Sequence, residues 1–147
     1  MAFRGSFSYT LDAKNRLTIP ARFRASFADG VVLALEREPA RCISIWQISV
    51  FDAFTESLVK GFHSLSGEGA TVRRLYNSLT HDTELDAAGR VIVPPHMLAD
   101  TGINGREVVV NGAGDRLELW EQEAWAEECR RLMAAVKTIT EGLGDPA

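Results

Sequence analysis

Four positively charged side chains lie close together near the N-terminus of this 147-residue chain, at Lys14, Arg16, Arg22 and Arg24. Asp12 is the acidic residue beside them. Arginine and lysine side chains bind phosphate groups, and arginine also makes bidentate hydrogen bonds to guanine. The cluster is therefore a candidate contact surface for a polyanion. The alternative is an ordinary scatter of charge over a solvated surface.

The net charge of the whole chain, −4 at pH 7, argues at first against a nucleic-acid partner. The two halves of the chain differ, however. Residues 1–74 contain ten Lys and Arg against seven Asp and Glu, a balance of +3, whereas residues 75–147 contain six against thirteen, a balance of −7. A polyanion is steered by the local potential and not by the total charge. Nucleic-acid binding therefore remains open for the first half of the chain.

The basic cluster overlaps a ten-residue segment that occurs twice, 74 positions apart. Residues 11–20 read LDAKNRLTIP, and residues 85–94 read LDAAGRVIVP. The same spacing relates two pairs of aromatic residues, Trp46 with Trp120 and Phe51 with Trp125. One offset shared by a turn motif and two aromatic positions is typical of a module duplicated in tandem.

Each copy is expected to begin with a tight turn between two strands. Asp12 and Asp86 can accept hydrogen bonds from the backbone N–H groups that follow them. Asn15 and Gly89 occupy the same place in the two copies, and both residue types tolerate a positive φ. We interpret these four residues, together with Arg90, as structural parts of the turns.

The two turns differ in charge at their tips, because Lys14 of the first is replaced by Ala88 in the second. We therefore expect Arg16 to be available for a ligand, and Arg90 to pair with an acidic neighbour. The alternative for Arg16 is the same kind of pairing, with Asp12, which would lock the turn without any contact to a ligand.

Alternating and helical patterns of apolar residues outline the elements that must hold the turns. We expect strands at 3–9, 16–19, 31–36, 42–46, 81–85, 90–93, 107–111 and 116–120. We expect helices at 21–27, 49–60, 70–79, 95–101 and 122–140. Ser49 and Asp52 predict a capping box at the start of the second helix. The last helix carries an apolar stripe from Trp125 to Ile139, which needs a partner surface in this chain or in another subunit.

The sequence contains none of the GxSxG, P-loop or HExxH motifs of common enzyme classes. Its histidines, His63, His81 and His96, lie at no metal-ligand spacing, and Cys42 and Cys129 are expected to be reduced thiols in a cytoplasmic protein. No apolar run approaches the ~20 residues of a membrane span. We therefore expect no catalysis, metal, cofactor, small-molecule substrate or membrane contact.

The Asp-x-x-Gly-Arg-like turn, followed by a β-branched strand and proline, resembles the AbrB-type swapped-hairpin fold. The pair of turns, with Phe3-Arg4-Gly5 before the first, resembles one family within it, the bacterial MraZ regulators, although Asn15 stands where that family usually has glycine. The resemblance ends around Ala135 and implies an α+β fold, a tandem double-split β-barrel with peripheral helices and an internal pseudo-twofold. It implies SpoVT-AbrB-type modules at 7–54 and 83–126, a linker with a short helix at 55–82, and a C-terminal helix and tail at 127–147.

The resemblance implies a sequence-specific DNA-binding transcriptional regulator that represses the bacterial division and cell-wall gene cluster, including its own gene. Family members form closed rings of identical subunits, here expected as an octamer, which would bind short direct repeats in promoter DNA. DNA contact in the family is attributed to the first turn, which gives Lys14 and Arg16 here, with Arg22 and Arg24 beside them. Such a protein would be cytoplasmic and nucleoid-associated. The alternative is an antitoxin-like or protein-interaction module of the same fold, which binds a protein through its C-terminal helix.

Overall fold

The computed structural model describes residues 2–36, 40–62 and 67–143. Parts of the expected linker and tail, at 63–66 and 144–147, lie outside the described residues, and so does His63. The strands are β1 (Ser6–Thr10), β2 (Arg16–Thr18), β3 (Val31–Leu35), β4 (Ile43–Trp46), β5 (Thr80–Thr83), β6 (Arg90–Ile92), β7 (Glu107–Gly112) and β8 (Leu117–Glu121). The helices are the 3₁₀-helix η1 (Ala21–Phe27) and the α-helices α1 (Ile48–Val59), α2 (Gly67–Ser78), α3 (Pro95–Asp100) and α4 (Gln122–Gly142).

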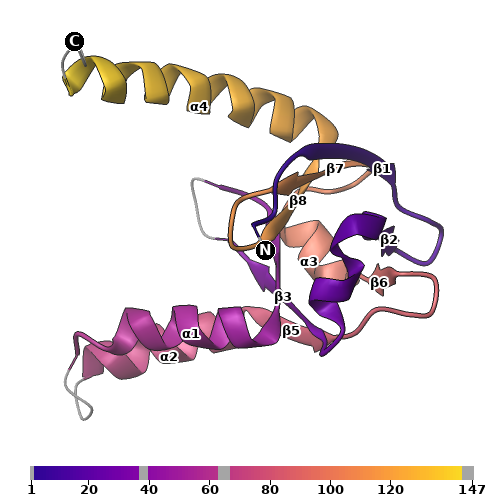
Figure 1. Ribbon diagram of the computed structural model, residues 1–147, viewed down its shortest axis with the longest axis horizontal. Helices are drawn as coiled ribbons and strands as arrows, with labels where there is room; N and C mark the ends of the chain where they lie inside the picture. Colours follow the sequence, from indigo (N-terminus) through magenta and orange to yellow (C-terminus); the bar gives the residue numbers. More distant parts are fainter. Residues whose placement is uncertain (1, 37–39, 63–66, 144–147) are drawn as a thin grey trace.

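The architecture is mixed α+β and is built around an antiparallel sheet with the strand order β1-β7-β8-β4-β3-β5 (Figure 1). Within the described residues, the sheet does not close into the expected barrel, because its edge strands β1 and β5 are not paired with each other. The strands β2 and β6 leave the sheet and form a separate two-stranded ribbon. Pro20 and Pro94, which have no N–H donor, follow these short strands and end the ladder.

The strand register repeats between the two copies of the sequence, which are therefore related by a pseudo-twofold. In the ribbon, Leu17 lies opposite Val91, its own counterpart in the second copy. Where β4 meets β8, Ser44 lies opposite its own counterpart, Glu118. The strand β1 of the first copy pairs with β7 of the second, and β5 of the second pairs with β3 of the first. Each copy therefore completes the sheet of the other.

One hydrophobic core fills the space between the main sheet, the ribbon and the short helices, and both copies contribute to it. The ring of Phe3 stacks on Phe27 of η1 at 5.5 Å and meets Phe23 edge-to-face at 5.2 Å. Leu17 and Val91 of the ribbon are fully buried in the same core. The ribbon is thus anchored from beneath by its alternate side chains, which makes it a stiff support for the two turns.

The helix α1 lies on the other face of the sheet, where Trp46 stacks on Phe54 at 5.0 Å and meets Phe51 at 5.6 Å. The helix α2 runs beside α1 (Figure 1), and Tyr76 meets Phe54 at 6.0 Å. The apolar face of α1 is therefore covered by the sheet on one side and by α2 on the other.

The helix α4 occupies the place in the second copy that α1 occupies in the first, but it extends away from the body of the molecule (Figure 1). Its first turns are anchored where Trp125 packs against Trp120 at 5.4 Å. None of its described residues is buried. The apolar side chains exposed along the rest of the helix and at its C-cap are Leu132, Met133, Val136, Ile139 and Leu143. Much of the stripe expected from the sequence therefore has no partner surface within the described chain.

The start of α1 differs from the sequence prediction. The helix begins at Ile48, its N-cap is Gln47, and no side-chain hydrogen bond caps it. The predicted capping box at Ser49 is wrong, because the helix begins earlier than expected and Ser49 lies within its first turn. The side chain of Gln47 instead donates a hydrogen bond to the carbonyl oxygen of Ser26, at 3.0 Å, and ties the start of α1 to η1.

Candidate nucleic-acid interface

The first turn is organised by the carboxylate of Asp12. Its Oδ1 atom accepts hydrogen bonds from the backbone N–H groups of Lys14 and Arg16, both at 2.9 Å. Its Oδ2 atom forms an ion pair with Nε of Arg16 at 2.5 Å. Asn15 adopts a φ of +59° and donates its backbone N–H to the carbonyl oxygen of Asp12. One carboxylate thus shapes the turn and orients the guanidinium group.

The second turn repeats this arrangement. Oδ1 of Asp86 accepts from the N–H groups of Ala88 and Arg90 at 2.9 Å, and Oδ2 pairs with Nε of Arg90 at 2.9 Å. Gly89 adopts a φ of +78° at the place of Asn15. The intraturn ion pair is therefore common to both turns, and it does not by itself distinguish a ligand-binding arginine from a structural one.

These hydrogen bonds stabilise the ionised carboxylates. The backbone N–H of Arg16, aided by its side chain and by the N–H of Lys14, lowers the pKa of Asp12 to about 2. The corresponding donors, first the N–H of Arg90, lower the pKa of Asp86 as well. Both aspartates are therefore charged at neutral pH, and both turns keep their geometry there.

The tips of the turns differ, because Lys14 is exposed at the first turn, whereas Ala88 is exposed at the second. The Arg16 side chain is partly exposed beside Lys14. In the described part of the chain, the guanidinium group of Arg16 contacts Asp12 through Nε, and its Nη groups have no other partner. The first turn therefore presents two cationic groups to solvent on a rigid support.

Arg24 contacts the second turn. Its Nε donates a hydrogen bond to the carbonyl oxygen of Ile19 at 2.9 Å. Its side chain also lies against Gly89, where an added Cβ atom would come within 2.2 Å of Nε. Arg24 is partly buried in this position, so the structure gives it a role in holding the two copies together.

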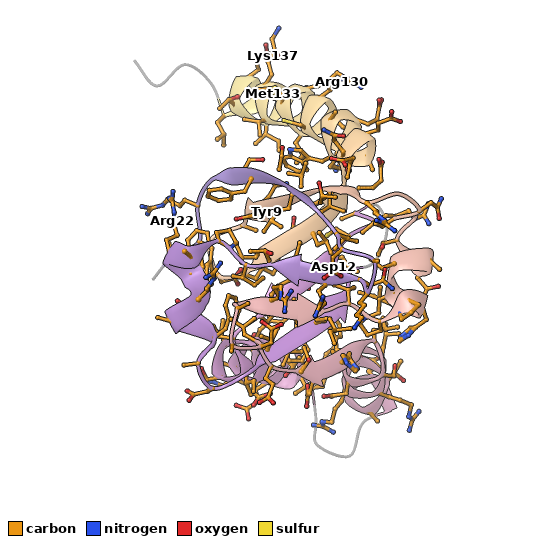
Figure 2. The ribbon with its side chains drawn as sticks, turned by 90° about the vertical axis from the view of Figure 1, so that its right-hand side faces the viewer. Tyr9, Asp12, Arg22, Arg130, Met133 and Lys137 are labelled. Carbon is orange, nitrogen blue, oxygen red and sulfur yellow. The ribbon has the colours of Figure 1, made fainter. Side chains whose placement is uncertain are left out.

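Arg22 projects from η1 and is exposed. Its guanidinium carbon lies 5.1 Å from the ring centroid of Phe7 and 5.7 Å from that of Phe23. In the view of Figure 2, the ribbon faces the reader, Asp12 lies right of centre and Arg22 points outward at the left edge. Of the four basic residues predicted from the sequence, the structure thus brings only Lys14 and Arg16 together on one turn.

The neighbours of these cations on the adjacent strand were not predicted from the sequence. Because β2 pairs with β6, Arg16 lies opposite Ile92 and Thr18 lies opposite Arg90. The strand pattern of the sequence could have predicted them. Successive side chains of a strand point to opposite faces, so if apolar Leu17 and Val91 point into the core, the residues on either side of each must point to the outer face. The four outward side chains of the ribbon are Arg16, Thr18, Arg90 and Ile92.

No group of His, Cys, Asp and Glu side chains in the described part of the chain is arranged to hold a metal ion. No helix among the described residues is long and apolar enough to cross a membrane. Cys42 is buried and lies near Glu118 and Glu36, and burial raises the pKa of its thiol.

Comparison with known proteins identifies relatives over nearly the whole chain. Residues 2–69 and 78–141 match the family model described as "MraZ protein, putative antitoxin-like". The chain is 38% identical over 133 residues to a protein of Paenarthrobacter aurescens, covering 90% of each chain. It is 35% identical over 131 residues to a protein of Thermus thermophilus, covering 88% of this chain and 89% of the relative.

A protein of Carboxydothermus hydrogenoformans is 30% identical over 143 residues, which is 97% of each chain. All three relatives carry the name transcriptional regulator MraZ. The match to the family model and the extent of these alignments agree with the duplicated turns, which recur in register about the pseudo-twofold. The chain therefore belongs to the MraZ family.

Proposed function

We propose that this protein is a sequence-specific DNA-binding transcriptional regulator and not an enzyme. The observation that carries the proposal is the first turn, where Lys14 and Arg16 lie together at the surface on a ribbon anchored in the core. The second turn has the same geometry without the lysine. The relatives named transcriptional regulators support the assignment.

The contacts of Arg16 fit it for reading DNA. The ion pair with Asp12 uses Nε and leaves the Nη groups for a ligand. A guanidinium whose orientation is set in advance loses less conformational entropy on binding guanine or phosphate. Lys14 would add a phosphate contact from the tip of the turn. In this proposal Asp12 and Asn15 shape the first turn, while Asp86, Gly89 and Arg90 shape the second.

The finer fold and domain assignments are part of the same proposal. We assign the chain to the AbrB-type swapped-hairpin class, with modules at 7–54 and 83–126. The linker would span 55–82, and the C-terminal helix and tail would span 127–147. The exchange of strands between the copies, with β1 beside β7 and β5 beside β3, supports this assignment.

We further propose that identical subunits form a closed ring, an octamer, that binds short direct repeats in promoter DNA. The exposed apolar side of α4 supports self-association, because α2 covers the corresponding helix α1 and no described segment covers α4 in the same way. A ring presents several first turns at fixed intervals, so each contact raises the effective concentration of the next. Repression of the division and cell-wall gene cluster, including the protein's own gene, and association with the nucleoid follow from the family resemblance.

The decisive experiment compares Arg16→Ala with the matched control Arg90→Ala in a mobility shift of DNA from upstream of the protein's own gene. Loss of one guanine contact costs about 1–3 kcal/mol, and a ring multiplies the loss. Arg16→Ala should therefore abolish the shift, while Arg90→Ala should retain it. Affinity of the wild type should fall steeply between two salt concentrations, because phosphate contacts release counterions. Normal DNA binding by Arg16→Ala would remove the proposed interface.

The same exposed helix favours a second candidate function, an antitoxin-like module that binds another protein through α4. Much of the apolar side of α4 is free of contacts within the described chain, and the acidic second half of the sequence would suit a basic partner. Copurification of a small basic protein with the wild type, and its loss on Val136→Glu, would favour this candidate. Recovery of a homo-oligomer that retains DNA binding without such a partner would count against it.

A further inference from the structure

The ribbon formed by β2 and β6 presents an apolar side chain to solvent. Leu17 and Val91 are fully buried beneath the ribbon, whereas Ile92 is 57% exposed on its outer side. Successive side chains of a strand point to opposite faces, so Ile92 shares the outer face with Arg16, Thr18 and Arg90. An isoleucine at this place adds nothing to the core.

The fold does not require isoleucine at position 92. Its counterpart about the pseudo-twofold is Thr18, since both residues follow the central Leu17 or Val91 of their strand. Threonine is also β-branched and suits a strand equally well. Packing in the core therefore does not account for the isoleucine at position 92.

The position of Ile92 ties it to the basic turn. It lies directly opposite Arg16 in the ribbon register, whereas Thr18 lies opposite Arg90. Directly opposite residues of an antiparallel pair have Cβ atoms about 4.5–5.5 Å apart. Bases along one DNA strand follow each other at about 3.4 Å. Two side chains at this separation can reach the same or adjacent base pairs.

We propose that Ile92 reads thymine, by packing its side chain against the C5-methyl group in the major groove beside the guanine contacted by Arg16. The inference rests on the proposed DNA-binding function and deepens it. The major groove admits a two-stranded ribbon, and the thymine methyl group is the apolar feature displayed there. Arg16 and Ile92 together form a two-residue reading unit, one polar and one apolar. At the second turn, the equivalent positions hold Arg90 and Thr18, so the apolar member of the unit is absent there.

The test uses a synthetic duplex from upstream of the protein's own gene, with each thymine in turn replaced by deoxyuridine, which lacks only the methyl group. Dissociation constants are measured for the wild type and for Ile92→Thr, which carries the residue of the equivalent position. Burial of one methyl group corresponds to about a fourfold change in affinity. Replacement of the contacted thymine should weaken wild-type binding by about this factor. Ile92→Thr should bind the thymine duplex more weakly and should lose less affinity than the wild type when the same thymine is replaced by uracil, because the single methyl group of threonine makes a smaller apolar contact.

The double-mutant cycle separates a direct contact from a general effect, because only a direct contact makes the two losses non-additive. Additive losses, or unchanged binding by Ile92→Thr, would overturn the inference. A change in the oligomeric mass of Ile92→Thr would also overturn it, because the residue would then serve a subunit interface. The proposed function is tested separately by Arg16→Ala. If Arg16→Ala loses DNA binding while no uracil replacement changes the dissociation constant of the wild type, the proposed function stands and only the role of Ile92 is refuted.

Discussion

At the scale of single residues, the two aspartates explain why both turns look alike although only one carries a basic tip. Each carboxylate accepts two backbone N–H groups and pairs with the arginine four residues later. Selection for turn geometry alone therefore accounts for Arg90. In the proposed function, the specialised residues are those that the turn geometry does not need, namely Lys14 at the tip and Ile92 on the neighbouring strand.

The depressed pKa of Asp12 makes a prediction for stability in acid. A carboxyl group whose pKa falls on folding stabilises the protein fully above its ordinary pKa of about 3.9, and this stability is lost as the pH falls through the folded value. For Asp12 that value is about 2. The Tm of the wild type should therefore exceed that of Asp12→Asn at pH 6, and the difference should close as the pH falls from about 4 to 2.

Thermal unfolding followed by circular dichroism measures this difference. Asp86→Asn should behave in the same way, since the pKa of Asp86 is lowered by the equivalent donors. A gap between wild type and Asp12→Asn that stays constant down to pH 2 would contradict the role given to the charged carboxylate.

At the scale of elements, both tight turns of the ribbon can form because each has a residue that accepts a positive φ, Asn15 in one and Gly89 in the other. The two positions are not equivalent in their surroundings, because Arg24 packs against Gly89. The first turn has room for the side chain of Asn15, whereas the equivalent space beside Gly89 is occupied by the side chain of Arg24 from the other copy.

Gly89→Ala should destabilise the protein, because a non-glycine residue in the left-handed region costs about 1–2 kcal/mol and the new Cβ would collide with Arg24. The matched control, Asn15→Gly, should change the free energy of unfolding by less than about 0.5 kcal/mol. Urea unfolding measures both values. The double variant Gly89→Ala, Arg24→Ala should recover part of the loss, and a purely additive result would argue against the collision.

At the scale of the whole molecule, the pseudo-twofold relates most elements but not all of them. The core, the sheet and both turns obey it. The helices α1 and α4 do not, since α1 is paired with α2, while α4 projects alone at the other end of the molecule (Figure 1). One unpaired apolar helix on each subunit is the feature that would drive self-association.

Val136→Glu with Ile139→Glu should therefore break the proposed ring into smaller species, because both side chains are largely exposed, at 59% and 62%, and contribute little to the fold of one chain. Light scattering after size exclusion would report the mass. Lys137→Ala, which changes a charged residue between them, is the control and should leave the mass unchanged. The broken assembly should bind DNA much more weakly, because the gain from multiple contacts is lost. An unchanged mass would exclude α4 as the subunit interface.

The residue pattern alone predicted the elements well, because apolar periodicity is a local property of the chain. The two turns, the ribbon strands after them, and helices such as η1 and α3 lie close to their expected bounds. The predicted capping box was wrong because the helix begins at Ile48, one residue before Ser49, and the N-cap residue Gln47 hydrogen-bonds to the distant Ser26 instead of capping the helix.

The duplication, the turn chemistry and the MraZ resemblance could all be read from the amino-acid order, because they are relations between positions in one chain. Which strands pair across the copies could not, since hydrogen bonds between distant segments form only when the core is assembled. Tertiary structure decided that Arg24 contacts Gly89 of the other turn, that Arg22 points elsewhere, and that Ile92 stands beside Arg16. It also decided that α4 stays uncovered, because no described segment remains to occupy the place that α2 takes on α1.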